Sequence, residues 1–179
     1  TRPIDTRPID TRPIDTRPID TRPVDTTAPT TQERADLQET LTQHRLFLTV
    51  PAQGLTEEQI RQRSTVSELT IGGIIKHVTA AERSWVSFIL EGPSAMAWDS
   101  QTAADWAAEF EVGPEETLGS LLAGYAEVAA RSDEVLATLP SLDLAHPLPE
   151  APWFEPDATW SARRVFLHII AETAQHAGH

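Results

Sequence analysis

The chain contains no cysteine, and this absence removes several chemistries at once. Without cysteine it cannot form a disulfide, bind a metal through thiolate sulfur or use a cysteine nucleophile. Basic residues are also scarce, because 14 Lys and Arg stand against 27 Asp and Glu and leave a net charge of −13. Nucleic-acid binding depends on cationic groups that displace phosphate counterions, so this balance predicts no nucleic-acid partner.

Long hydrophobic runs are missing as well. No apolar run approaches the roughly 18 residues that span a bilayer, so we expect no transmembrane helix and no membrane partner. The chain does not open with a basic segment followed by an apolar stretch, as a signal peptide would. Together with the lack of cysteine, which suits a reducing compartment, these features predict a cytoplasmic protein.

The first 25 residues are five copies of a pentapeptide, four of them Thr-Arg-Pro-Ile-Asp and the fifth with Val24. One apolar side chain per repeat cannot form a core, and a proline at every fifth residue blocks a continuous helix. We therefore predict a disordered tail and linker over residues 1–31 and a single domain over residues 32–179. A docking role for the Arg-Pro units is the alternative. The chain ends abruptly at His179, so we expect its last helix to be cut short.

Four segments of the domain carry apolar residues at helical spacing. They cover about residues 31–49, 71–91, 114–139 and 161–179. Thr70 and Ser161 are expected to cap the second and fourth helices, and Pro114 is expected at the first position of the third. No run of alternating strands is convincing, so we predict an all-α protein built as a four-helix bundle.

Two of the connections between these helices are long, over residues 93–113 and 140–160. Short connections would favour an up-down-up-down order, so these lengths leave the topology open. The second connection holds Trp153, Phe154 and Trp160, and we expect it to fold over one end of the bundle.

Three of the six histidines crowd the last predicted helix. At about 100° per residue, His168, Glu172, His176 and His179 lie within one stripe. Glu172 and His176 are spaced i, i+4, which allows two side chains on adjacent turns to hold one cation. A third ligand could come from His77, on the apolar side of the second helix. Histidines on apolar faces are more often core residues, so spacing alone leaves both interpretations open.

Several segments of the domain match a known pattern. They are residues 72–78 and 81–85 around His77, and residues 160–168 and 172–179 of the last helix. These segments resemble the DinB-like metal-binding superfamily. Residues 147–154 are typical of its actinobacterial branch, which is usually described as a domain of unknown function or as mini-circle protein.

The resemblance implies a four-helix bundle that holds a divalent metal ion, often zinc or nickel, through three side chains at one end. The positions that match the family's ligands are His77, Glu172 and His176. Glu172 stands where a histidine is commoner, and this variation is similar to the branch of mycothiol-dependent maleylpyruvate isomerase. His168 and His179 are then expected to support the ligands or to serve as alternative ones.

The same resemblance implies a small-molecule thiol cofactor, mycothiol, and a thiol-dependent S-transferase or isomerase that acts on an electrophile. Because the chain has no cysteine, the thiol has to come from that cofactor. Trp85, Trp153 and Trp160 are the expected walls of an apolar substrate pocket, with core packing as the alternative for them. The alternative function is a non-enzymatic, metal-stabilised bundle in dimerisation or stress response, and a homodimer is the expected assembly.

Overall fold

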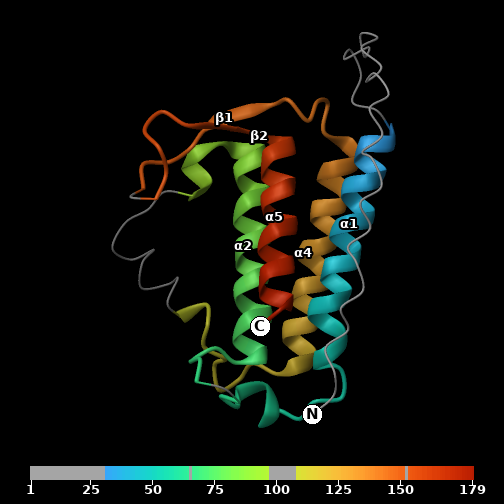
Figure 1. The fold of residues 1–179 in the computed structure, drawn as a ribbon, viewed down its shortest axis with the longest axis vertical. Helices are drawn as coiled ribbons and strands as arrows, with labels where there is room; N and C mark the ends of the chain where they lie inside the picture. The colour runs from blue at the N-terminus through green and yellow to red at the C-terminus, as the bar shows by residue number, and fades with distance from the viewer. Residues whose placement is uncertain (1–30, 65, 97–107, 152) are drawn as a thin grey trace, which may run out of the picture.

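The computed structural model describes residues 31–64, 66–96, 108–151 and 153–179, which form a four-helix bundle covered at one end by a two-stranded hairpin (Figure 1). The bundle helices are α1 (Thr31–Thr49), α2 (Ile71–Glu91), α4 (Leu118–Thr138) and α5 (Ala162–Ala177). Within the described residues, three short 3-10 turns accompany them: η1 (Val50–Ala52), η2 (Gln59–Arg61) and η3 (Pro93–Met96). This architecture confirms the predicted all-α four-helix bundle. The predicted disordered tail lies outside the described residues, except for Thr31 at the start of α1.

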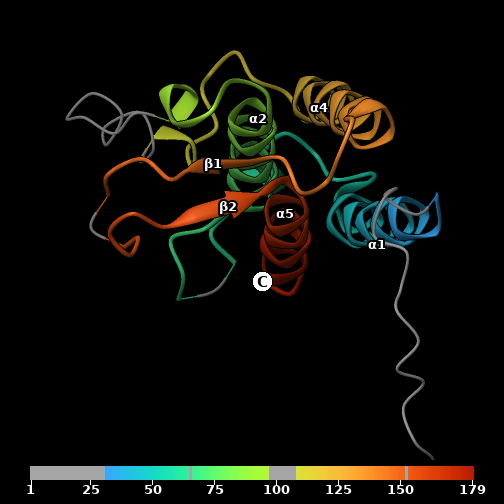
Figure 2. The same cartoon turned by 90° about the horizontal axis from the view of Figure 1, so that it is seen from above.

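Seen from above, the helices follow one another around the bundle in the order α1, α5, α2, α4 (Figure 2). Two hydrophobic clusters fill its interior. The first joins the start of α1 and α5 to the end of α2 and α4: Leu37, Leu41, Trp85, Val86, Phe88, Ile89, Val135, Leu136, Leu139, Leu142, Ala162, Val165, Phe166 and Ile169. The second joins the opposite ends: Leu48, Ala52, Ile60, Ile74, Ile75, Val78, Leu118, Leu121 and Tyr125.

The membership of these clusters fixes the direction of each helix. α1 and α5 run one way and α2 and α4 run the other, so the neighbours α2 and α4 are parallel (Figure 1). The chain between α2 and α4 therefore has to return along the length of the bundle, which the long connection allows. None of the helices in the described residues is both long and apolar enough to cross a membrane.

Side-chain caps define three of the helix starts. The Thr70 hydroxyl accepts a hydrogen bond from the Gly73 amide at 3.1 Å, and the Ser161 hydroxyl accepts one from the Arg164 amide at 3.2 Å, as predicted. The predicted start of the third helix at Pro114 is wrong, because α4 begins at Leu118.

The true N-cap of α4 is Thr117. Its hydroxyl accepts from the Ser120 amide at 3.1 Å, and the Ser120 hydroxyl accepts from the Thr117 amide at 2.9 Å. This reciprocal box gives two backbone amides a hydrogen-bond acceptor. Pro114 has no side-chain acceptor to offer, because proline at a helix start only removes a donor. Pro114 lies instead in a turn closed by a 3.2 Å hydrogen bond from the Glu116 amide to the Gly113 carbonyl.

Two short strands bring the second long connection back over the bundle. β1 (Ala145–Pro147) pairs antiparallel with β2 (Thr159–Ser161), with His146 opposite Trp160. The hairpin lies across the end of the bundle where α2 ends and α5 begins, as expected for this connection (Figure 1). The His146 ring fastens it to α2 through a 3.1 Å hydrogen bond between Nε2 and the Ile89 carbonyl.

A charged pair lies inside the bundle. Glu82 of α2 is 1% exposed and Arg45 of α1 is 8% exposed. The Arg45 guanidinium donates to both carboxylate oxygens of Glu82, and it also donates to Asp133 of α4 at 2.8 Å. Burial lowers the pKa of Arg45, but the hydrogen bonds and charges of Glu82 and Asp133 outweigh burial and raise it. The guanidinium of Arg45 therefore links α1 to both α2 and α4.

Candidate metal centre

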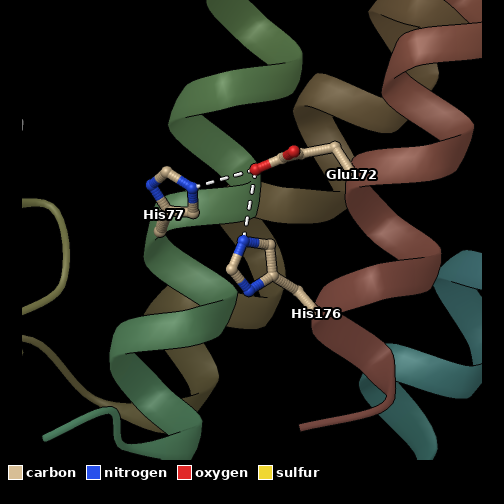
Figure 3. Close-up of side chains that lie close together, drawn as sticks. All are labelled: His77, Glu172 and His176. Carbon is tan, nitrogen blue, oxygen red and sulfur yellow. Dashed lines mark hydrogen bonds and ion pairs between the residues drawn. The ribbon is translucent and has the colours of Figure 1, made fainter.

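Three side chains from two neighbouring helices converge on one point near the C-terminus. His77 of α2 is 6% exposed, and its Nε2 lies 3.2 Å from Oε1 of Glu172 on α5. One turn further along α5, the Nε2 of His176 lies 3.2 Å from the same oxygen. Figure 3 shows the rings of His77 and His176 both directed toward this oxygen of Glu172. The spacing of Glu172 and His176 thus places both on the side of α5 that faces α2.

The dimensions of this cluster suit a metal ion. The three donor atoms all lie within 4.8 Å of one another. Tetrahedral bonds of about 2.0–2.1 Å place neighbouring ligand atoms about 3.3 Å apart. The two 3.2 Å separations from Glu172 match that spacing. Two imidazoles and one carboxylate form a donor set found in catalytic zinc sites, where a fourth position stays open.

The electrostatics of the cluster keep the carboxylate ionised. Hydrogen bonds shared with His176 and His77 hold the pKa of Glu172 well below its usual range, although burial opposes them. The remaining ring nitrogen of His176, Nδ1, is buried without a hydrogen-bond partner among the described residues. An anionic oxygen between two imidazoles is therefore the electrostatic centre of the site.

Two further side chains contact the His77 ring from the connection that precedes α4. Glu109 Oε2 lies 3.4 Å from the Nδ1 of His77, and the Phe110 ring stacks on the imidazole with 4.0 Å between centroids. Burial raises the pKa of Glu109, although His77 and nearby cations oppose that rise. Reasoning from the sequence missed both residues, because no helical spacing relates them to His77. The one sequence signal related to them is the pair Gly72-Gly73 at the start of α2, which lets this segment pack closely against the helix.

His168 and His179 lie outside the donor cluster in the described part of the chain. His168 sits one turn from Glu172, edge-on to the rings of Trp85 and Trp160 at 4.8 and 5.1 Å. Burial lowers the pKa of His168. The exposed His179 stacks on His176 at 5.3 Å and contacts the Gln175 carbonyl at 3.2 Å through Nδ1. Both predicted alternatives therefore flank the centre along the chain, His168 one turn before Glu172 on α5 and His179 just after the end of that helix.

The three tryptophans expected around a substrate pocket have different environments. Trp85 is 6% exposed and belongs to the core, where it stacks on Trp160 at 4.9 Å. Phe154 meets both rings edge-on, and Trp153, which is 58% exposed, meets Phe154 at 6.1 Å. Two surface cavities of about 350 and 520 Å³ run beside α1, and neither is lined by these tryptophans or by the metal-ligand candidates. The aromatic group is thus a packed cluster with one exposed edge at Trp153.

The four-helix bundle, with two imidazoles and a carboxylate gathered between its second and last helices, has the architecture of a DinB-like protein, and the chain is a member of that superfamily. The particular family follows from comparison with family models. The model described as Mycothiol-S-transferase matches residues 36–179, and the chain belongs to that family. Comparison with curated proteins finds no match to this chain.

Proposed function

We propose that this protein is a divalent-metal-dependent S-transferase that joins the thiol of mycothiol to a small electrophile. The family membership supplies the cofactor class, and the convergence of His77, Glu172 and His176 is the observation that supports metal dependence. Zinc and nickel are the candidate ions, because imidazole nitrogen suits both. We assign the activity to the domain of residues 32–179.

Each of the three side chains has a definite task in this proposal. His77 and His176 present Nε2 toward the centre, and Glu172 presents an ionised oxygen between them. This set lowers the charge of a bound dication to +1 and leaves a position open for a thiol. A bound ion supplies Lewis acidity, which lowers the pKa of a thiol and so provides a nucleophile at neutral pH.

The first experiment is a measurement of metal content and affinity. Purified wild-type protein should contain about one divalent ion per chain by elemental analysis. After chelation it should rebind Zn²⁺ or Ni²⁺, and the variants His77→Ala and Glu172→Gln should lose more than the 10–100-fold in affinity that outer-shell changes cost. His44→Ala is the matched control, since it removes an imidazole from α1 outside the donor cluster.

The second experiment asks for turnover. Mycothiol and a chlorinated bimane should give a fluorescent conjugate in the presence of the protein, and the rate should fall at least tenfold after chelation and in the Glu172→Gln variant. Conjugation that persists without metal would contradict the proposal. Stoichiometric metal binding without turnover of any electrophile would favour the alternative, a metal-stabilised bundle without catalysis.

A further inference from the structure

The segment of residues 109–113, which we call the strap, lies directly on the first turns of α2. Two glycines permit this approach. A Cβ atom added at Gly73 would overlap the Phe110 carbonyl oxygen, and one added at Gly72 would lie 2.6 Å from Cγ2 of Val112. Because real Cβ atoms do not come so close to other atoms, only glycine at both positions lets the strap sit where it does.

Polar contacts fasten the strap at several points. Lys76 of α2 donates from Nζ to the Glu111 carbonyl and to the Glu116 carboxylate, each at 2.9 Å. Arg61 donates to the Gly113 carbonyl at 3.1 Å, and the Gly113 amide donates to Glu116 at 2.6 Å. Cationic side chains from two different elements thus hold backbone carbonyls of the strap. The backbone positions from which its side chains extend are therefore fixed relative to α2.

The fixed strap places two side chains against the ring of His77. Phe110 stacks on one face with 4.0 Å between centroids and 20° between planes. The Glu109 carboxylate lies 3.4 Å from Nδ1, while Nε2 on the other side of the ring lies 3.2 Å from Glu172. The imidazole is therefore held between two carboxylates, one in the candidate centre and one on the strap.

We infer that Glu109 is a positioning residue, which accepts the Nδ1 proton of His77 and thereby directs the bare Nε2 into the metal centre. The inference rests on the proposed function, because that proposal makes His77, Glu172 and His176 the ligands of a metal ion. Histidines that bind metals generally donate their other ring N–H to a carboxylate, carbonyl or water, and loss of that partner typically costs 10–100-fold in metal affinity. The Glu109 carboxylate lies beside Nδ1 of His77, where a metal-binding histidine needs a hydrogen-bond acceptor. Along the chain Glu109 is 63 positions before Glu172, the first candidate ligand on α5, so only the fold brings the two to the same imidazole.

The test compares Glu109→Leu and Glu109→Gln with the matched pair Glu111→Leu and Glu111→Gln. Glu111 is an exposed neighbour on the same strap, so its variants carry the same changes in charge and polarity. Zn²⁺ affinity is measured by competition with a chromophoric chelator after circular dichroism has verified the helical fold. We expect Glu109→Leu to bind Zn²⁺ 10–100-fold more weakly than Glu111→Leu. Glu109→Gln should lose less, since its amide oxygen can still accept the proton.

A second readout uses the metal-free protein. Nitrogen-15 NMR of His77 should show a protonated Nδ1 in the wild type and in the Glu111 variants. In Glu109→Leu the Nδ1 position should lose its proton, which leaves the ring protonated at Nε2, beside Glu172. Unchanged protonation of Nδ1, or Zn²⁺ affinity of Glu109→Leu within twofold of Glu111→Leu, would overturn the inference. Failure of the wild type to bind any metal would instead refute the proposed function, and the NMR comparison would still decide the role of Glu109.

Discussion

The buried pair of Arg45 and Glu82 leads to a prediction that is independent of the metal centre. Arg45→Met replaces the guanidinium by an apolar chain of similar length and leaves the Glu82 carboxylate, which is 1% exposed, without its bonded cation. Breaking one partner of a buried ion pair typically costs about 3–5 kcal/mol, since an uncompensated charge stays inside. A domain of this size has about 5–15 kcal/mol in all, so the variant should remain folded but weakened.

The double variant Arg45→Met/Glu82→Leu separates the loss of a partner from the loss of attraction. Apolar replacement of both members of a buried pair is often neutral or stabilising. We therefore expect the double variant to lie within about 1–2 kcal/mol of wild type and well above Arg45→Met. Asp133, whose side chain is 31% exposed, keeps access to water in both variants and should contribute little to the difference.

Urea denaturation followed by circular dichroism at 222 nm, with a chelator present, measures these free energies. At about 2–4 °C per kcal/mol, Arg45→Met should melt roughly 6–20 °C below wild type. A loss of less than about 1 kcal/mol in Arg45→Met would show that the carboxylate is not isolated from water. A double variant less stable than Arg45→Met would show that the unpaired Glu82 carboxylate is not the source of the loss, and either result would refute the reasoning.

Three further predictions concern the helix starts, the aromatic cluster and the glycine face of α2. Thr117→Ala removes the cap of α4 and should lower the free energy of unfolding by about 1 kcal/mol in urea melts. The exposed control Thr42→Ala lies inside α1 and should not lower it, because alanine has the higher helix propensity. Because burial lowers the pKa of His168 below its unfolded value of about 6.5, the unfolded state gains the proton first, and stability is lost as pH falls through that value. The stability advantage of metal-free wild type over His168→Asn should therefore shrink between pH 7.5 and 5.5, and a constant difference would contradict this. Gly73→Ala should lose about 1–3 kcal/mol by overlap with the strap, whereas Gly124→Ala, with no atom within 4 Å, should gain about 0.5–1 kcal/mol; equal effects in thermal melts would refute the close approach.

Local features of the sequence predicted what local physics controls. The caps at Thr70 and Ser161 and the shared face of Glu172 and His176 depend on residues three or four apart, and each is present in the structure. The start of α4 was predicted wrongly because Pro114 followed by two glutamates is typical of a helix start. The capping box of Thr117 and Ser120 instead sets the start at Leu118.

Features that depend on packing between distant segments were not predictable in this way. Helical periodicity placed His77 on an apolar face, but only the adjacency of α2 and α5 brings it to Glu172. The pairing of Glu109 with His77 depends on a connection whose path no periodicity describes. The same holds for the direction of α4, which the lengths of the connections left open.

The parallel arrangement of α2 and α4 has a consequence for how such a protein can diversify. A helix of 21 residues is about 32 Å long, so the chain must travel back over that distance before α4 can begin. The last part of this return, residues 109–113, packs against the His77 ring, so a segment outside the four helices covers one side of the donor cluster. Substitutions at the exposed positions of this segment would therefore change the surroundings of the candidate centre without changing any residue of the helices.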